Sequence, residues 1–177
     1  LDCLTLKYEL IDLPNNYCFE LVDSEVQREN RKSAYNERHN QLKRAEEILN
    51  VENLGSVKID QLNKNKIDDL LIYKRALHVV TENQRTKDAK NFMLKQDMKQ
   101  FGHLMNLSHL SYSKDFEAST EDVDLLTKRS IESGALGCRL TGGGFGGFTV
   151  SLIAKKDYEQ WYNNMSKYYS KDKFFKV

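Results

Sequence analysis

Hydrophobic and polar residues alternate at the start of the chain. Over residues 1–13, leucines and Tyr8 are separated by polar or charged positions. This period of two predicts a strand with one buried face. A turn follows at residues 14–16, and the apolar run at residues 17–22 predicts a second strand. We therefore expect these first two elements to pair as antiparallel strands.

The middle of the chain has helical periodicity, with apolar residues spaced three or four positions apart. Ser33 is suited to cap the first helix, and Gly134 to end the fourth. The residues between the first and second helices are polar and irregular, which predicts a loop with a short helix near residues 67–71. The four expected helices cover residues 33–49, 73–93, 98–110 and about 119–133.

The carboxy-terminal part returns to strand patterns. Residues 137–141 and 148–154 are expected to form two strands on either side of a glycine turn. A helix over residues 156–169 and a terminal strand over residues 173–177 follow. The mixture predicts an α+β fold, with antiparallel sheets packed with helices and helical runs between two antiparallel pairs.

Composition narrows the class of protein. The 177 residues carry 27 basic and 26 acidic side chains, and 40% of them are hydrophobic. This near balance argues against a nucleic-acid partner held by phosphate neutralisation, and no apolar run is long enough to span a membrane. Three separated cysteines, Cys3, Cys18 and Cys138, are expected to be buried or half-buried free thiols in a reducing cytoplasm. The chain begins with leucine, so we expect a processed terminus or a fragment.

A glycine-rich segment, Thr141–Gly147, is the sharpest motif. Five of its residues are glycines: Gly142, Gly143, Gly144, Gly146 and Gly147. A dinucleotide fingerprint would lead into a helix, whereas this segment leads into the β-branched run at residues 148–153. A Walker loop is excluded because no lysine followed by serine or threonine comes after the glycines. The expected geometry is strand, tight loop, strand.

Such an excess of glycine indicates close approach to the loop backbone, because two residues suffice for a hairpin and glycine loses more entropy on folding. The approaching group could be a ligand, a phosphate held by backbone amides, or another loop. The alternative is a bend that lets a neighbouring backbone pack closely. The spacing of the glycines leaves these possibilities open.

Several segments resemble the galactokinases. These enzymes belong to a superfamily that also contains homoserine, mevalonate and phosphomevalonate kinases. The stretch 134–147 is similar to the third signature motif of that family. Further similar segments follow the family's order along the chain: 1–3, 33–38, 75–86, 105–111 and 115–117. Together they resemble the galactokinase branch, whereas the glycine loop alone indicates only the superfamily.

The resemblance implies that residues 1–177 are the carboxy-terminal part of a galactokinase, with strands in residues 1–32 packing against a missing amino-terminal part. The whole enzyme would transfer the γ-phosphoryl group of ATP to the anomeric hydroxyl of galactose, with Mg²⁺. Its first signature, its Ser-rich phosphate loop and its catalytic aspartate have no counterpart in this sequence. We therefore expect no catalytic residue and no metal ligand in this chain, and no activity from it alone. Its expected partners are galactose, ATP and the rest of its own chain, without nucleic acid or membrane.

The resemblance also implies site residues. Tyr35, on pattern alone a core aromatic, is expected to bind the sugar, and residues 142–147, with Phe145 packing to hold them, to form an active-site loop. Asn36 and Arg38 are expected to hold local backbone or pair with acids. Two rival functions remain open: a non-catalytic sensor of sugar and ATP, and a related sugar kinase of the same superfamily.

Other polar residues have structural interpretations. A nucleophile–base pair of Ser108 or Ser111 with His109 is disfavoured because sequence neighbours on a helix do not face each other. Glu82 with a nearby arginine is expected to form a structural ion pair. Arg139 could meet an anion or serve packing. Among the four histidines, His39 is expected to be exposed. Structural roles are expected for His78 and His109, and no role is assigned to His103.

Overall fold

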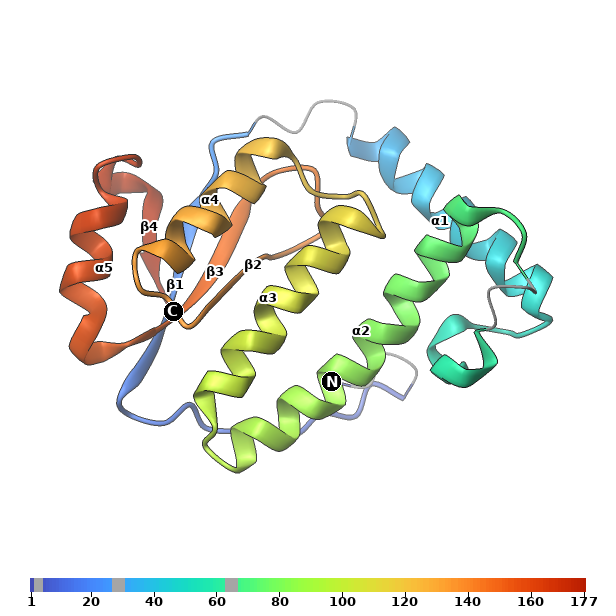
Figure 1. Ribbon diagram of the computed structural model, residues 1–177, viewed down its shortest axis with the longest axis horizontal. Helices are drawn as coiled ribbons and strands as arrows, with labels where there is room; N and C mark the ends of the chain where they lie inside the picture. Colours follow the sequence, from blue (N-terminus) through green and yellow to red (C-terminus); the bar gives the residue numbers. More distant parts are fainter. Residues whose placement is uncertain (2–4, 27–30, 63–66) are drawn as a thin grey trace.

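A computed structural model describes residues 1, 5–26, 31–62 and 67–177. Its centre is one antiparallel sheet of four strands in the order β2-β3-β1-β4 (Figure 1). The strands are β1 (Tyr17–Asp23), β2 (Gly137–Leu140), β3 (Phe148–Ala154) and β4 (Phe174–Lys176). With its helical connections, the sheet has the connectivity of a split βαβ unit.

Alternate residues of the strands point to opposite faces of the sheet. On one face, Val22 and Ile153 pack with Trp161 and Met165 of α5 (Tyr158–Met165) and with Leu126 of α4 (Glu121–Glu132). On the other face, a second cluster joins Leu152 of β3 to Met98, Met105 and their neighbours on α3 (Met98–Lys114). Helices α4 and α5 therefore cover one face of the sheet, whereas α3 packs against part of the other face near strand β2.

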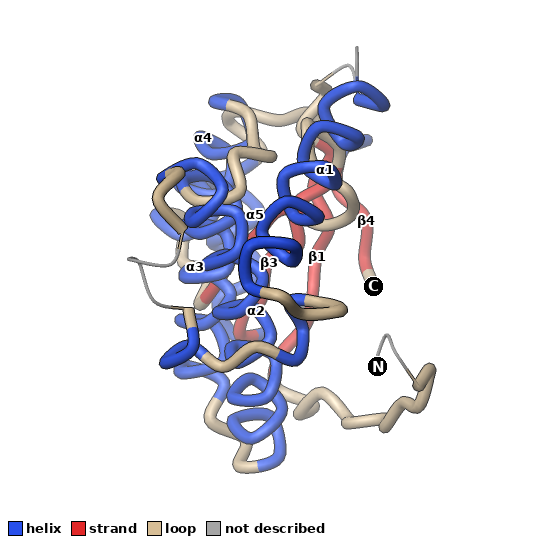
Figure 2. Tube along the Cα trace, turned by 90° about the vertical axis from the view of Figure 1, so that its right-hand side faces the viewer, coloured by secondary structure: helices blue, strands red, loops and turns tan. Residues whose placement is uncertain are grey.

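A third cluster lies away from the sheet. It joins α1 (Arg31–Leu49) to α2 (Leu70–Leu94) through Ala45, Ala76 and Val80, together with short 3₁₀ turns at Leu54–Ser56 and Ile59–Gln61. Figure 2 shows the strands gathered on one side of α3 and α4, with both chain ends on that side. Within the described ranges, no helix is both long and apolar enough to cross a membrane.

Helix α3 lies along the outer edge of the sheet. Asn106 Oδ1 accepts a hydrogen bond from the backbone N–H of Cys138 at 2.9 Å, and His109 Nδ1 accepts one from the N–H of Leu140 at 3.3 Å. At Gly102 and Gly137 the two backbones touch, and a Cβ on Gly137 would lie 2.3 Å from the Gly102 oxygen. These contacts provide hydrogen-bond partners for backbone N–H groups of β2 on the edge where no further strand pairs with it.

Most helix ends are where their sequence signals predict. Thr120 caps α4 by accepting from the N–H of Val123, and Gly134 follows its end with a φ of +117°. Asp69 caps α2, which begins at Leu70; the separate short helix predicted near residues 67–71 was wrong, because residues 67–69 are not helical. The Ser33 cap was wrong, because α1 already begins at Arg31. Helix α3 is longer than predicted, and α5 is shorter.

The strand predicted over residues 1–13 was wrong for its described part, residues 5–13, which form no strand. Leu6, Tyr8 and Leu10 are exposed by 71%, 71% and 88%. Strand β1 pairs with β3 and β4, not with the preceding segment. Alternation gives a segment the tendency to be a strand, but a strand also needs a partner edge. For the same reason there is one sheet of four strands and not two separate pairs.

Candidate active site

The glycine loop connects β2 and β3 as a hairpin, which confirms the predicted strand, loop, strand geometry. The N–H of Thr141 donates to the Phe148 carbonyl at 2.9 Å and closes its base. Gly142 and Gly144 have φ values of +86° and +87°, and Phe145 has a φ of +58°. Glycine adopts such φ values at little steric cost, so it suits the loop path at Gly142 and Gly144, whereas Phe145 is one of the uncommon residues with a Cβ in the left-handed region.

Two neighbouring segments approach the buried part of the loop. A Cβ on Gly144 would lie 2.5 Å from the carbonyl oxygen of Ala118, and one on Gly146 would lie 2.9 Å from Cγ1 of Val26. The N–H of Phe145 donates to that same Ala118 oxygen at 2.8 Å. Close packing of neighbouring chain segments is therefore confirmed at Gly144 and Gly146.

The first residue of the loop is different. Gly142 is exposed, and a Cβ built on it would meet no atom within 4 Å. Close packing of protein atoms therefore does not account for glycine here, although the positive φ does. A ligand beside Gly142 stays a prediction.

Tyr35 lies near the start of α1 with 58% of its surface exposed, so the core-aromatic interpretation was wrong. Arg38, one helical turn later on the same face, donates from Nε to the Phe116 carbonyl at 2.7 Å. Its guanidinium carbon lies 6.0 Å from the centre of the Phe145 ring. The face of α1 that carries Tyr35 is thus brought beside the glycine loop. The expectation that Arg38 pairs with acids is confirmed by its contact with Glu37. The backbone that it holds belongs to a distant segment and not, as predicted, to its own surroundings in the chain.

Arg75 was missed as a site residue by sequence reasoning. Its side chain on α2 is only 1% exposed, and it contacts Glu117 at 2.7 Å. This hydrogen bond, with the positive charge, lowers the pKa of the Glu117 carboxyl. The available signal was an arginine within the apolar stretch that Ala76 and Leu77 continue. Such a position implies a buried charge with dedicated partners.

The two buried histidines have structural partners. His78 Nδ1 lies 3.0 Å from the Ser111 hydroxyl, and burial lowers the pKa of His78 to about 4. His109 accepts from Leu140, and its Nε2 lies 3.1 Å from Oδ1 of Asp124. Burial lowers the pKa of His109 against the opposing charge of Asp124. The disfavoured serine–histidine pair with His109 is not formed: the Ser108 hydroxyl donates to Glu82 instead. His39 and His103 are exposed.

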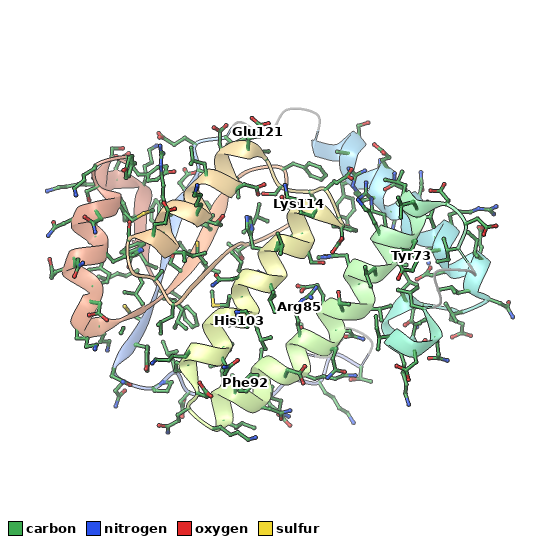
Figure 3. The ribbon with its side chains drawn as sticks, in the orientation of Figure 1. Tyr73, Arg85, Phe92, His103, Lys114 and Glu121 are labelled. Carbon is green, nitrogen blue, oxygen red and sulfur yellow. The ribbon has the colours of Figure 1, made fainter. Side chains whose placement is uncertain are left out.

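A cavity of about 410 Å³ lies between the open face of the sheet, α2 and α3. Its polar end contains Glu82, which contacts Arg85, accepts from Ser108 and lies 3.5 Å from Arg139. Figure 3 shows Arg85 on the side of α2 that faces α3. Burial raises the pKa of Glu82, but the hydrogen bonds from Ser108 and Arg85 outweigh it, so the net shift is downward. The predicted structural ion pair is confirmed, and Arg139 joins it.

Comparison with known proteins shows which families this chain resembles. Residues 89–171 match the family model described as GHMP kinases C terminal. The galactokinase of Fusobacterium nucleatum is 37% identical, and that of Levilactobacillus brevis 35% identical, each over 96% of this chain and 46% of its own length. Residues 89–171 are therefore similar to the carboxy-terminal domain of the GHMP kinases. The chain spans about half the length of the curated relatives that it matches.

The fold of this chain recurs in solved structures. The crystal structure of Lactococcus lactis galactokinase complexed with galactose matches with a TM-score of 0.90 and 30% identity, over 99% of this chain and 49% of that one. The crystal structure of L. major mevalonate kinase in complex with R-mevalonate matches with a TM-score of 0.59 and 17% identity, over 90% of this chain and 41% of that one. The second likeness shows the fold alone. The predicted α+β fold of helices and antiparallel sheet is confirmed.

The structure describes two of the three cysteines. Cys18 and Cys138 are free thiols, half-buried and buried, as predicted, and burial raises the pKa of both. Cys3 lies outside the described residues. Among the residues that the structure describes, no group of three or more His, Cys, Asp or Glu side chains could hold a metal ion.

Proposed function

We propose that the protein carrying this chain phosphorylates galactose at its anomeric hydroxyl with ATP, giving galactose 1-phosphate. The observation that carries this proposal is the likeness to the L. lactis galactokinase complexed with galactose, which extends over 99% of the chain at 30% identity. The curated galactokinases support the same branch of the family at 35–37% identity. The GHMP kinase match supports ATP as the phosphoryl donor.

In this proposal Tyr35 donates or accepts a hydrogen bond at a sugar hydroxyl. Its exposure leaves its phenol free to meet a ligand, and Arg38 fixes the helical face on which it lies. The glycine loop, residues 142–147, forms one wall of the cleft, and Gly142 at its start leaves open space beside the backbone. Phosphoryl transfer depends mostly on positioning and charge stabilisation, so a rigid wall beside the sugar is a direct contribution to the reaction.

The remaining catalytic groups are proposed to lie outside these 177 residues. The described residues offer no cluster that fits Mg²⁺, and the glycine loop lacks the lysine and hydroxyl of a Walker-type phosphate cradle. We assign the Mg²⁺ ligands, the Ser-rich phosphate loop and the aspartate to the rest of the protein. This chain alone is then inactive, and we place the whole protein in the cytoplasm.

The experiment is a substrate screen on the full-length protein. Galactose, glucose and mevalonate are offered separately with Mg·ATP, ADP release is followed, and the product is identified by ³¹P NMR. Galactose-dependent ADP release with a sugar 1-phosphate signal is expected. Galactose binding without ADP release would identify a sensor, and turnover of another acceptor alone would identify a related kinase.

A further inference from the structure

Residues 115–118 connect three parts of the site. Figure 3 labels Lys114 and Glu121, which bracket this segment between α3 and α4. Its four consecutive carbonyl oxygens all accept hydrogen bonds from outside the segment. The carbonyls of Asp115, Phe116 and Glu117 accept from the guanidinium groups of two arginines, and the carbonyl of Ala118 accepts from the N–H of Phe145.

The two arginines come from different helices. Arg75 of α2 donates to the Asp115 carbonyl, to the Glu117 carboxylate at 2.7 Å and to Gln41 at 2.9 Å. Arg38 of α1 donates to the carbonyls of Phe116 at 2.7 Å and Glu117 at 3.1 Å. Planar guanidinium groups present several donors in a fixed geometry, which a lysine cannot reproduce. Together they hold three successive peptide groups.

The backbone of the segment has an unfavourable conformation, which these contacts stabilise. Glu117 has a φ of +52°, in the left-handed region that non-glycine residues seldom adopt. Strained conformations of this kind persist only where the surroundings fix them. Glu117 cannot relax without moving its carbonyl away from Arg38 and its carboxylate away from Arg75.

Side chains of the same segment add a second set of constraints. The Ser111 hydroxyl donates to the Asp115 carboxylate at 2.8 Å, so its oxygen accepts from Nδ1–H of His78. The ring of Phe116 stacks on the His78 ring, with centres 4.7 Å apart. His78 and Arg75 lie one turn apart on α2, so a single helix face holds both the backbone and the side chains of the segment.

We propose that Arg75 and Arg38 are positioning residues for the glycine loop: they fix residues 115–117 so that the carbonyl of Ala118 holds Phe145 and with it the loop. Neither arginine is a catalytic residue, since each acts through the backbone of the segment. The role in phosphoryl transfer rests on the proposed function; the role in loop geometry stands on the hydrogen bonds alone.

The first test is hydrogen exchange in the full-length protein, followed by mass spectrometry on a peptide covering residues 141–147. In Arg75→Gln and Arg38→Gln, exchange of this peptide should speed up by about tenfold, as expected when charge-assisted hydrogen bonds that hold the loop are lost. The peptide covering β3 should exchange as in the wild type. Arg38→Lys should restore only part of the protection, because an ammonium group cannot serve both carbonyls in the fork geometry.

The second test separates kcat from KM. Arg75→Gln should lower kcat by about tenfold or more while the KM for galactose changes by less than about threefold, because the loop and not Tyr35 is displaced. Arg44→Gln is the matched control. Like Arg38, Arg44 lies on α1 and forms an ion pair, in this case with Glu47, but both of these side chains are 65% exposed. It should leave loop exchange and kcat unchanged.

The outcomes distinguish the two proposals. Unchanged loop exchange in both glutamine variants would overturn the positioning role, as would equal acceleration in every peptide, which would show general destabilisation. If Arg75→Gln does not fold, the Arg38 pair of variants decides on its own. Selective loop acceleration in a protein whose wild type never phosphorylates galactose would support the positioning and overturn the proposed function.

Discussion

The backbone of Gly144 faces the carbonyl of Ala118 so closely that a Cβ atom on Gly144 would lie 2.5 Å from that oxygen. Real Cβ atoms do not approach an oxygen so closely, so one of the two segments must shift if a side chain is added. The contact joins the glycine loop to the segment that Arg38 and Arg75 hold. The contact therefore predicts that substitutions of Gly142 and Gly144, which look equivalent in the sequence, change the stability of the protein by different amounts.

Gly144→Ala should destabilise the protein more than Gly142→Ala. The two glycines have φ values of +87° and +86°, so the backbone strain of an alanine is about the same at both, on the order of 1 kcal/mol. Only Gly144 adds the clash with Ala118, which we expect to contribute roughly 1–3 kcal/mol more. Urea unfolding of both variants measures the difference. Equal losses would mean that the contact between the loop and the segment is easily displaced.

Tyr35→Phe in the full-length protein should raise the KM for galactose by about two- to tenfold with little change in kcat, which corresponds to one neutral hydrogen bond. The hydroxyl is removed from an exposed side chain, so stability should not change. Tyr168→Phe is the control, since Tyr168 is similarly exposed, by 55%. Galactose kinetics that match the wild type in both variants would remove Tyr35 from the sugar site.

His78 should make the protein less stable in mild acid. Burial lowers its pKa from 6.5 to about 4, so between these pH values the unfolded chain binds a proton that the folded protein does not. The contribution of the neutral, buried His78 to the free energy of unfolding is fully present above pH 6.5. It is lost as the pH falls through this window, and the free energy of unfolding then changes by up to about 1.4 kcal/mol per pH unit. His78→Asn should reduce this slope.

The measurement is urea unfolding at several pH values across that window. The exposed His39 provides the control variant, His39→Asn, which should keep the wild-type slope. Some slope should remain in His78→Asn because the pKa of His109 is also lowered by burial. A slope in His78→Asn as steep as in the wild type would show that His78 is not the titrating group.

The purified 177-residue chain should not release ADP from Mg·ATP in the presence of galactose. Its described residues offer no metal cluster, and its glycine loop has no Walker-type cradle, whereas phosphoryl transfer needs both a phosphate cradle and a metal site. A coupled assay with and without galactose is the direct measurement. Galactose-dependent turnover that survives repeated purification from host kinases would place catalytic groups within this chain.

The sequence by itself determined the elements whose signals are local. Residues 17–22, 98–110 and 148–154 adopted the predicted strand or helix, because the spacing of apolar residues reports which face of each element is buried. The cap at Thr120 and the stop at Gly134 were also readable, since each depends on groups within one turn of the chain. The hairpin form of the glycine loop followed from the β-branched run after it.

Only the tertiary structure decided what lies beside each element. Residues 5–13 alternate like a strand but form none, because pairing requires an edge that the pattern cannot supply. The sequence marks Arg75 as an arginine in an apolar stretch but does not say what it binds, and nothing local connects Arg38 to residues 115–117. In the structure both arginines donate hydrogen bonds to the carbonyls of that segment. Hydrogen bonds between positions far apart in the chain depend on how the helices pack and on how far side chains extend. The local spacing of hydrophobic and polar residues determines neither of these.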